Sequence, residues 1–328
     1  MNETELLFTD VLGCTRTQLY QEKKRILSRE ICAQIARVLK RRLKGEPLEY
    51  ILGHTEFMGL EFSVNSDVLI PRPDTEVLVE TVLNYVANAP DYRFQNPRIL
   101  EVGTGSGCIA VSLAKRISEA DIVATDVSQA ALDVAEANAH KNSVEDNISF
   151  FLSDLFDSPR ITGEKFDLIV SNPPYIKRDV IPTLACEVQH EPRLALDGGV
   201  DGLDFYRRIF REAPSHLKTD GFLMLEIGFD QKDELEKIIR SSQIFEVKEV
   251  ADRKAFIRFP KEMYRNDPRY YYNCNDIFGK ISIHDEYFEN NNMPVSDQVL
   301  LQIFGFSYDK PGNKYVAVFL RYLARIMH

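Results

Sequence analysis

Cysteine is scarce in this sequence, and its spacing excludes the common structural uses of the residue. The five cysteines are an odd number in 328 residues, and no two of them form a Cys-x-x-Cys pair: Cys14, Cys32, Cys108, Cys186 and Cys274. The pattern predicts neither a disulfide framework nor a zinc site, and it is typical of a reducing compartment. The six histidines show no metal-ligand spacing either, so we expect no metal centre.

Long apolar runs and a targeting segment are also missing. No stretch approaches the ~20 apolar residues that a membrane-spanning helix requires. The first residues, Met1–Glu5, lack the basic and apolar regions of a secretory signal peptide. We therefore expect a cytoplasmic protein that does not contact a membrane.

Positive charge is in deficit. Lysine and arginine total 40 against 50 acidic residues, which gives a net charge of −10 and a pI near 5.3. A broad nucleic-acid-binding face is therefore disfavoured, and we expect no stable binding to DNA or RNA. The one basic cluster of the N-terminal part consists of Lys40, Arg41, Arg42 and Lys44. It fits a solvated helix end favoured by the helix dipole, and it also fits a docking site for an acidic partner or RNA.

The length of the chain and its apolar content of 44% favour one large domain with appendages, or two domains. Helical periodicity without a strand signal predicts a small helical domain over residues 1–48. Residues 49–70 contain two short pieces rich in β-favouring side chains, Tyr50–Leu52 and Glu61–Val64, and predict a β-hairpin linker.

A repeating pattern of strands and helices within residues 71–260 predicts a parallel sheet with helical crossovers. An early proline followed by acidic residues marks the start of its first helix near Pro73. The segment Lys177–Val200 is long and marked by Pro and Gly, and connections of that length are usually functional or disordered. Seven segments are predicted strands: Ile99–Val102, Ile122–Thr125, Ile148–Leu152, Phe166–Val170, Phe222–Ile227, Phe245–Val250 and Ala255–Phe259.

The composition changes after Pro260, towards Tyr, Asn and Asp. We expect residues 261–328 to form a small accessory domain with two helices. A surface for a further partner and partial disorder are the alternatives, and the aromatic content argues against complete disorder.

A glycine-rich turn follows the first predicted strand. The run Gly103–Gly107 has the spacing G-x-G-x-G, with Glu101 two residues ahead, and precedes a predicted helix. Glycines let the backbone approach a ligand closely, and the N–H groups of a helix start favour an anionic group. The spacing differs from the G-x-G-x-x-G fingerprint of dinucleotide enzymes and resembles the first motif of S-adenosylmethionine-dependent methyltransferases. An ordinary turn between strand and helix is the alternative.

Acidic residues end the next two predicted strands. Asp126 can bind both ribose hydroxyls, or it can instead support the helix start at Ser128. Asp154 can accept a hydrogen bond from an exocyclic amine such as that of adenine, beside an apolar wall of Leu155 and Phe156, or it is an ordinary exposed acid. All three loops fall at the carboxyl ends of strands, where doubly wound sheets bind their ligands.

The segment Asn172–Tyr175, Asn-Pro-Pro-Tyr, ends the predicted strand Phe166–Val170, because proline cannot donate to a sheet ladder. The Asn172 side-chain oxygen and the Pro173 carbonyl are two acceptors that can hold a planar –NH2 group and aim its lone pair at an electrophilic methyl. Tyr175 can pack against the flat group. Catalysis would then come from positioning and from acceptors that strengthen as the nitrogen becomes positive. A strand stopped by proline before a turn is the alternative.

These residues together resemble one family, the peptide chain release factor glutamine N5-methyltransferases, also called PrmC or HemK. Asn-Pro-Pro-Tyr alone is shared with adenine and cytosine amino-methyltransferases of DNA, whereas the linker and Pro-Arg-Pro segments resemble the release-factor enzymes. The resemblance covers roughly residues 1–260 and rests on Gly45–Gly53, Leu69–Glu76, Glu101–Gly107, Asn172–Tyr175, Glu191–Leu196 and Gly202–Asp204.

The resemblance implies an α/β fold of the Rossmann-like, class I S-adenosylmethionine-dependent methyltransferase type, with a seven-stranded sheet, a small N-terminal helical domain and an extra C-terminal segment. It implies methyl transfer from S-adenosylmethionine, which leaves S-adenosylhomocysteine, to the glutamine N5 of the Gly-Gly-Gln tip of a class I release factor. The implied cofactor-binding residues are Gly103, Thr104, Gly105, Ser106, Gly107, Asp126, Asp154, Leu155 and Asn172. The implied substrate-binding residues are Asn172, Pro173, Pro174 and Tyr175, of which Asn172, Pro173 and Tyr175 are the catalytic candidates.

Other activities fit parts of the sequence. A ribosomal-protein glutamine and the N6 amine of adenine in DNA or RNA would use the same acceptor pair, although the net charge of −10 disfavours a nucleic-acid substrate. A non-catalytic cofactor-binding scaffold is disfavoured because all four sequence features are intact. A nicotinamide dehydrogenase is disfavoured by the glycine spacing.

Overall fold

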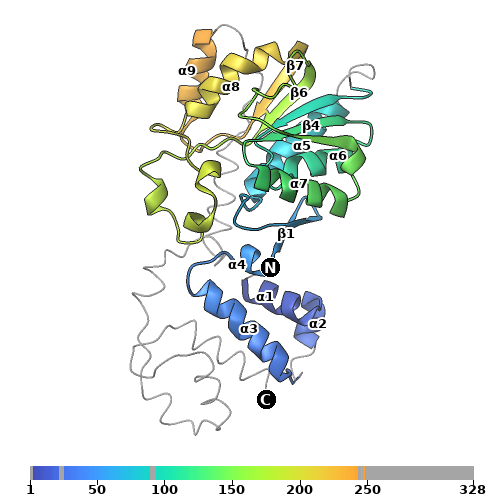
Figure 1. Cartoon of the computed structure of the whole chain (residues 1–328), viewed down its shortest axis with the longest axis vertical. Helices are drawn as coiled ribbons and strands as arrows, with labels where there is room; N and C mark the ends of the chain where they lie inside the picture. Colours follow the sequence, from blue (N-terminus) through green and yellow to red (C-terminus); the bar gives the residue numbers. More distant parts are fainter. Residues whose placement is uncertain (1–2, 22–25, 89–93, 243–244, 246, 248–328) are drawn as a thin grey trace. The chain divides into compact units, whose positions relative to one another are not determined.

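The computed structural model describes residues 3–21, 26–88, 94–242, 245 and 247 (Figure 1). The chain divides into two compact units. The first unit contains the residues up to Leu52 together with Ala185–Val188, and the second contains Gly53–Leu184 and the described residues from Gln189 onward. Within the described ranges, no helix is long and apolar enough to cross a membrane.

Short helices form the N-terminal part of the first unit: α1 (Glu3–Leu12), α2 (Arg16–Gln21), α3 (Arg29–Arg42) and α4 (Leu48–Leu52). Ser28 caps α3, because its side-chain oxygen accepts a hydrogen bond from the Ile31 N–H at 3.3 Å. A cluster of buried apolar side chains joins the helices, and Phe8 and Ile35 are among its fully buried members. This shared core stabilises helices that are too short to be stable alone.

The predicted hairpin linker begins with helix α4 and not with a strand. The sequence predicts extended backbone for Tyr50–Leu52, and this prediction is wrong, because the segment is helical. The carbonyl of Pro47 accepts a hydrogen bond from the Ile51 N–H at 3.2 Å, and the side chains of Leu48 and Tyr50 are buried. Packing against the apolar core outweighs the weak β preference of three residues.

The basic cluster at the end of α3 is partly neutralised within the first unit. Arg42 lies 2.8 Å from Glu3 and 2.5 Å from Glu187. Arg41 binds Glu46, with its Nε 2.7 Å from the carboxylate. Two of the cationic side chains are therefore engaged by nearby carboxylates, which favours the interpretation of this cluster as a helix end.

An antiparallel hairpin begins the second unit. Its strands are β1 (His54–Phe57) and β2 (Leu60–Ser63). The two-residue loop between them consists of Met58 and Gly59, which have φ angles of 53° and 74°. Positive φ at both loop positions matches the twist of the flanking strands. The hairpin lies within the range that the sequence predicts for it.

Parallel strands form the central sheet of the second unit in the order β5-β4-β3-β6-β7. The chain builds outward from β3 through β4 to β5, and then returns to the other side of β3 with β6 and β7. The strand order therefore reverses between β3 and β6, where doubly wound sheets bind ligands. The strands are β3 (Arg98–Val102), β4 (Asp121–Asp126), β5 (Ile148–Leu152), β6 (Phe166–Ser171) and β7 (Leu217–Leu225).

Helices cover both faces of this sheet (Figure 1). Successive strand residues alternate between two apolar cores, so that Ile99 faces one core and Leu100 the other. A parallel sheet that is buried on both faces needs continuous apolar runs, which the sequence supplies. One face carries α5 (Pro73–Ala87), α6 (Cys108–Arg116) and α7 (Gln129–Lys141), and the other carries α8 (Asp204–Glu212) and α9 (Lys232–Ser242).

The first five predicted strands and the parallel α/β arrangement are confirmed. The helix start near Pro73 is also confirmed. The predicted strands Phe245–Val250 and Ala255–Phe259 lie outside the described residues, apart from Phe245 and Val247, and so does the whole of residues 261–328. The sheet seen here therefore contains five of the seven strands that the sequence predicts.

Candidate active site

The glycine-rich turn joins β3 to α6 at the carboxyl edge of the sheet. Gly107 has a φ of 79°, a backbone conformation that favours glycine, and a Cβ at this position would also crowd the Cβ of Ala135 at 3.1 Å. The N–H groups of Gly103 and Thr104 donate to the carbonyl of Thr125 at 2.8 and 2.9 Å. These hydrogen bonds tie the turn to the neighbouring strand β4.

Ser106, in the middle of the turn, is buried and is held from α7. Its backbone carbonyl accepts a hydrogen bond from Asn138 Nδ2 at 2.9 Å. Asn138 is fully buried, and it also exchanges two hydrogen bonds with the backbone of Ser63, at 2.7 and 3.0 Å. One side chain thus connects the turn, α7 and the β1–β2 hairpin.

Glu101 is a buried carboxyl group beneath the turn. Its Oε2 accepts hydrogen bonds from the Thr104 hydroxyl at 2.7 Å and from the Ala110 N–H at 3.0 Å. Its Oε1 has no hydrogen-bond partner among the described residues. Burial raises the pKa of Glu101 from 4.5 to about 8, although the two hydrogen bonds oppose the rise. The neutral form therefore predominates at neutral pH.

Asp126 ends β4 and faces the turn. Its Oδ2 accepts a hydrogen bond from the Gly105 N–H and its Oδ1 from the Ser128 N–H, both at 2.9 Å. Burial raises the pKa of Asp126, and the backbone hydrogen bonds oppose the rise. Asp126 therefore does support the start of α7. Each carboxylate oxygen has a second lone pair, so this role leaves acceptor capacity for a ligand.

Asp154 and Leu155 follow β5 at the next strand end. Leu155 has a φ of 55°, which is uncommon for a residue other than glycine. The hydroxyl of Ser153 holds this conformation by donating to the Leu155 carbonyl at 2.9 Å. The side chain of Leu155 is buried, whereas Asp154 is half exposed and pairs with Arg208 of α8 at 2.9 Å.

The segment Asn172–Tyr175 leaves β6 beside the glycine turn, because Ser171 Oγ donates to the carbonyl of Val102 at 2.6 Å. Asn172 Nδ2 donates to Thr75 Oγ1 at 3.1 Å, and the Thr75 hydroxyl donates to Glu226 Oε2 at 2.8 Å. Since its NH2 group binds Thr75, Asn172 directs its carbonyl oxygen away from Thr75. Of the prolines that follow, Pro173 is buried and Pro174 is partly exposed.

Tyr175 is held at both its ends. Its hydroxyl donates to Glu226 Oε1 at 3.2 Å, and burial, followed by the charge of Glu226, raises the pKa of Tyr175, so the phenol stays protonated. Its backbone carbonyl accepts a hydrogen bond from Gln231 Nε2 at 3.0 Å. A Cβ on Gly198 would lie 2.7 Å from the Tyr175 Cα, so only glycine lets the chain pass this close.

The predicted long segment Lys177–Val200 returns to this strand end. The Gly198 N–H donates to the Ile176 carbonyl at 2.8 Å. Further along the segment, the Glu191 carboxylate is 1% exposed and lies 2.7 Å from Arg72, which precedes α5. The two motifs Leu69–Glu76 and Glu191–Leu196 therefore meet in the fold.

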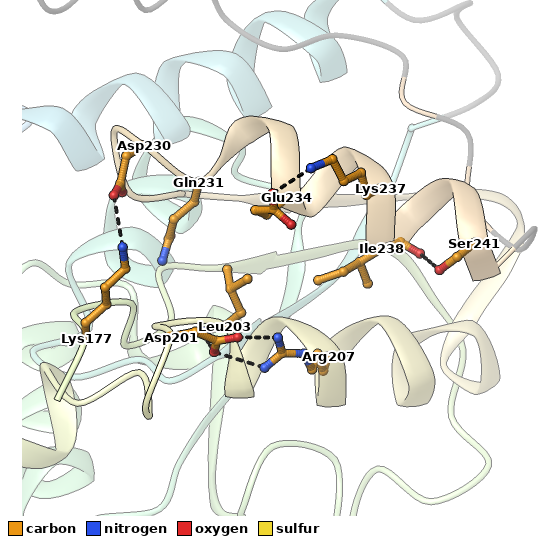
Figure 2. Close-up of a pocket in the computed structure, with 10 residues that line it drawn as sticks. All are labelled: Lys177, Asp201, Leu203, Arg207, Asp230, Gln231, Glu234, Lys237, Ile238 and Ser241. Atoms are coloured by element: carbon orange, nitrogen blue, oxygen red, sulfur yellow. Dashed lines mark hydrogen bonds and ion pairs between the residues drawn. The ribbon is translucent and has the colours of Figure 1, made fainter.

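A pocket of about 550 Å³ lies outside this constellation (Figure 2). Figure 2 shows that its charged side chains bind one another: Lys177 pairs with Asp230, Arg207 with Asp201 and Lys237 with Glu234. Leu203 and Ile238 are its apolar lining residues, and most of the others are charged side chains that already bind one another, so the strand ends, and not this pocket, are the candidate site. Among the described side chains, no group of three or more His, Cys, Asp or Glu could hold a metal ion.

Known proteins match both units of the chain. The family model described as methyltransferase small domain matches residues 74–199, and the one described as PrmC N-terminal domain matches residues 1–53. A release factor glutamine methyltransferase from Geobacter sulfurreducens is 44% identical over 232 residues, which are 70% of this chain and 78% of the relative. The chain belongs to the release factor glutamine methyltransferase family.

Two further proteins, one of them a solved structure, are similar to this chain. The release factor glutamine methyltransferase of Clostridium acetobutylicum is 38% identical over 262 residues, which are 80% of this chain and 89% of the relative. The solved structure of a methyltransferase from Pyrococcus furiosus is 18% identical, covers 66% of this chain and 89% of that one, and has a TM-score of 0.43.

Three side chains at the site are not predicted by the sequence: Thr75, Asn138 and Glu226. Thr75 lies within the Leu69–Glu76 motif. Glu226 lies inside the predicted strand Phe222–Ile227, whereas the structure ends β7 at Leu225 and places Glu226 directly after it. Asn138 lies in the middle of a helix and carries no local signal. Its role follows from contacts with residues 32 and 75 positions away.

Proposed function

We propose that this chain transfers a methyl group from S-adenosylmethionine to the side-chain amide nitrogen, N5, of the glutamine in the Gly-Gly-Gln tip of a class I peptide chain release factor. Membership of the family supports methyl transfer, and the release factor glutamine methyltransferase names of the relatives support the substrate. The observation that carries the proposal is the Asn172 amide beside the glycine turn, with its NH2 group bound to Thr75 and its carbonyl oxygen directed elsewhere.

The residues at the strand ends fit this cofactor. The first N–H groups of α6 lack helical acceptors, which suits the carboxylate of the methionine part. Asp126 keeps acceptor capacity for the ribose hydroxyls, and Asp154 with Leu155 suits the amine and ring of adenine. When bound, S-adenosylmethionine supplies an electrophilic methyl group on a sulfonium. Transfer of this methyl group needs no metal ion.

Asn172 and Pro173 position the substrate amide. An amide nitrogen is a poor nucleophile because its lone pair is delocalised into the carbonyl. Asn172 Oδ1 and the Pro173 carbonyl each accept one N–H of the glutamine, which orients the nitrogen and stabilises the positive charge that develops as the N–C bond forms. One proton then leaves the nitrogen for solvent, and the neutral methylated amide remains. Tyr175 packs its ring against the flat amide.

The helical first unit contributes to recognition of the release factor in this proposal. Its small apolar core and its own ion pairs make it a distinct body that can bind protein without changing the catalytic sheet. The region beyond residue 260 is a candidate surface for a further partner.

Methyl transfer with labelled S-adenosylmethionine tests the proposal. Parallel reactions contain a class I release factor, a ribosomal fraction or duplex DNA, and mass spectrometry maps the methylated atom. We expect label on glutamine N5 of the release factor. Label only on a ribosomal protein or on adenine would overturn the substrate assignment.

The variant Asn172→Ala tests the catalytic assignment. We expect methyl transfer about 10²–10³ slower with cofactor binding retained, as for the loss of one electrostatic stabiliser. Asn142→Ala, which removes an amide that follows α7 and donates to the Glu61 carbonyl at 3.1 Å, is the matched control and should leave the rate unchanged. An Asn172→Ala enzyme of full activity would contradict the role of Asn172.

A further inference from the structure

Hydrogen bonds of defined direction connect the ends of α5, β6 and β7. Asn172 Nδ2 is 3.1 Å from Thr75 Oγ1, and Thr75 Oγ1 is 2.8 Å from Glu226 Oε2. The other oxygen of Glu226 accepts from the Tyr175 hydroxyl at 3.2 Å. Two side chains of the Asn-Pro-Pro-Tyr segment are thus attached to the same carboxylate, one of them through Thr75.

The chemistry of the groups fixes the direction of this chain of hydrogen bonds. A carboxylate accepts hydrogen bonds and donates none, so Thr75 must use its single proton towards Glu226. Its oxygen can then only accept from Asn172, and the Asn172 group that faces Thr75 must be the NH2. The orientation of the amide therefore follows from Glu226.

Thr75 and Glu226 are held firmly enough to act in this way. Thr75 is 2% exposed in the first turn of α5, and its N–H donates to the Arg72 carbonyl at 3.0 Å. The Glu226 N–H donates to the Ser171 carbonyl at 3.0 Å, and its carbonyl accepts from the Tyr206 hydroxyl at 2.8 Å. The backbone of Glu226 is therefore fixed on both sides.

We propose that Thr75 and Glu226 are positioning residues that keep the carbonyl oxygen of Asn172, and not its NH2 group, turned towards the substrate amide. The proposal rests on the proposed function of Asn172. An asparagine turned by 180° would present donors to the N–H groups of glutamine. It would bind the glutamine carbonyl oxygen instead and hold the wrong atom at the methyl group. The Thr75–Glu226 pair would thereby select nitrogen over oxygen.

Steady-state kinetics of three variants test the proposal. Thr75→Val keeps the shape of the side chain and removes the hydroxyl, and we expect kcat to fall about 10- to 100-fold, the range for a misplaced reactant, with KM for the release factor little changed. Thr75→Ser keeps the hydroxyl and should restore kcat to within about threefold of the parent. The control Thr81→Val removes another α5 hydroxyl, which donates to the Val77 carbonyl at 2.7 Å, and should leave kcat unchanged.

A double-mutant cycle separates positioning from general loss of structure. In an Asn172→Ala background, single-turnover rates should show no further effect of Thr75→Val, because Thr75 acts only through Asn172. Independent losses, in which each substitution lowers the single-turnover rate by its own factor, would overturn the proposal. So would a Thr75→Val enzyme with normal kcat, or a Thr75→Ser enzyme no better than Thr75→Val.

Nuclear magnetic resonance tests the same contact without methyl transfer. In the full chain with ¹⁵N label, we expect a protected side-chain NH2 signal of Asn172, assigned by its absence in Asn172→Ala, and loss of that protection in Thr75→Val. If the parent protein methylates no glutamine but the protected signal is present, the proposed function fails and the contact stands. If methylation occurs and the signal is unprotected, the positioning proposal fails alone.

Discussion

Arg72 and Glu191, which are 119 positions apart in the sequence, form an ion pair in which one Arg72 nitrogen lies 2.7 Å from both carboxylate oxygens. The pair joins the residue before α5 to the segment that returns to the end of β6. The Glu191 side chain is 1% exposed, and that of Arg72 is 30% exposed. The buried Glu191 carboxylate is therefore the group that depends on this pair, because it has little contact with solvent.

Replacement of Arg72 by methionine tests this dependence. The variant keeps a long side chain but removes a positive charge beside a buried carboxylate, and we expect the free energy of unfolding to fall by about 2 kcal/mol. Arg178→Met is the matched control, since Arg178 is 55% exposed where it pairs with Asp197, and it should cost less than about 1 kcal/mol. Urea unfolding measures both values, and equal losses would contradict the distinction.

Asn138 gives a second prediction. Asn138→Ala leaves three backbone groups without their partner, the buried carbonyl of Ser106 and the partly buried N–H and carbonyl of Ser63, and we expect destabilisation of about 3 kcal/mol. Cofactor affinity should also fall, because the glycine turn loses its support from α7. Asn142→Ala, at the residue that follows α7 and has a more exposed side chain, should change stability less than Asn138→Ala does. Thermal unfolding and calorimetric titration measure the two effects.

Glu101 makes stability depend on pH. The unfolded chain titrates this group near pH 4.5 and the folded chain near pH 8, so the folded chain binds more protons between these values. Its contribution to stability is complete below about pH 4.5 and is lost as the pH rises through about 8. Glu101→Gln resembles the protonated group, and its stability relative to the parent should increase by up to about 1.4 kcal/mol per pH unit in this window. A constant difference from pH 5 to pH 9 would contradict the assignment.

Asp126→Asn tests the link between the glycine turn and the proposed ribose site. Both Asp126 oxygens accept backbone N–H groups, and the single oxygen of asparagine can replace only one of them. We expect S-adenosylmethionine to bind at least about tenfold more weakly, which corresponds to about 1.4 kcal/mol. For the parent protein, affinity should fall as the pH is lowered through the raised pKa of Asp126, because protonation removes acceptor capacity. Isothermal titration at several pH values measures both.

The parts of the site that depend on local pattern are predictable from the sequence. Gly103–Gly107, Asp126 and Asn172 each stand where an apolar strand ends, and a parallel sheet brings such ends to one edge. Glu226 also follows a strand in the structure, but the predicted strand Phe222–Ile227 includes it and no motif surrounds it. Tyr50–Leu52 shows the opposite case, in which a β-favouring local pattern is helical because its side chains join the core of the first unit.

The contacts that fix the site are less predictable, because they join distant segments. Thr75 meets Glu226 across 151 positions, and neither residue has a spacing that indicates the other. The Asn-Pro-Pro-Tyr segment indicates two acceptors but leaves the orientation of the Asn172 amide undetermined. The orientation of the amide depends on Glu226, which comes 54 positions later in the chain and reaches Asn172 through Thr75. Only the folded structure shows this contact.

The strand order β5-β4-β3-β6-β7 also implies an order in which the strands can pair during synthesis of the chain. Strands β3, β4 and β5 are consecutive in the chain and adjacent in the sheet, so a nascent chain can pair them through the helical crossovers α6 and α7 soon after they leave the ribosome. Strand β6 must return to β3 across 69 positions, and Glu226 emerges only after β7. A growing chain would thus complete the half that carries the proposed nucleoside site well before the half that carries the proposed amide acceptor, and Asn172 would acquire its orientation last.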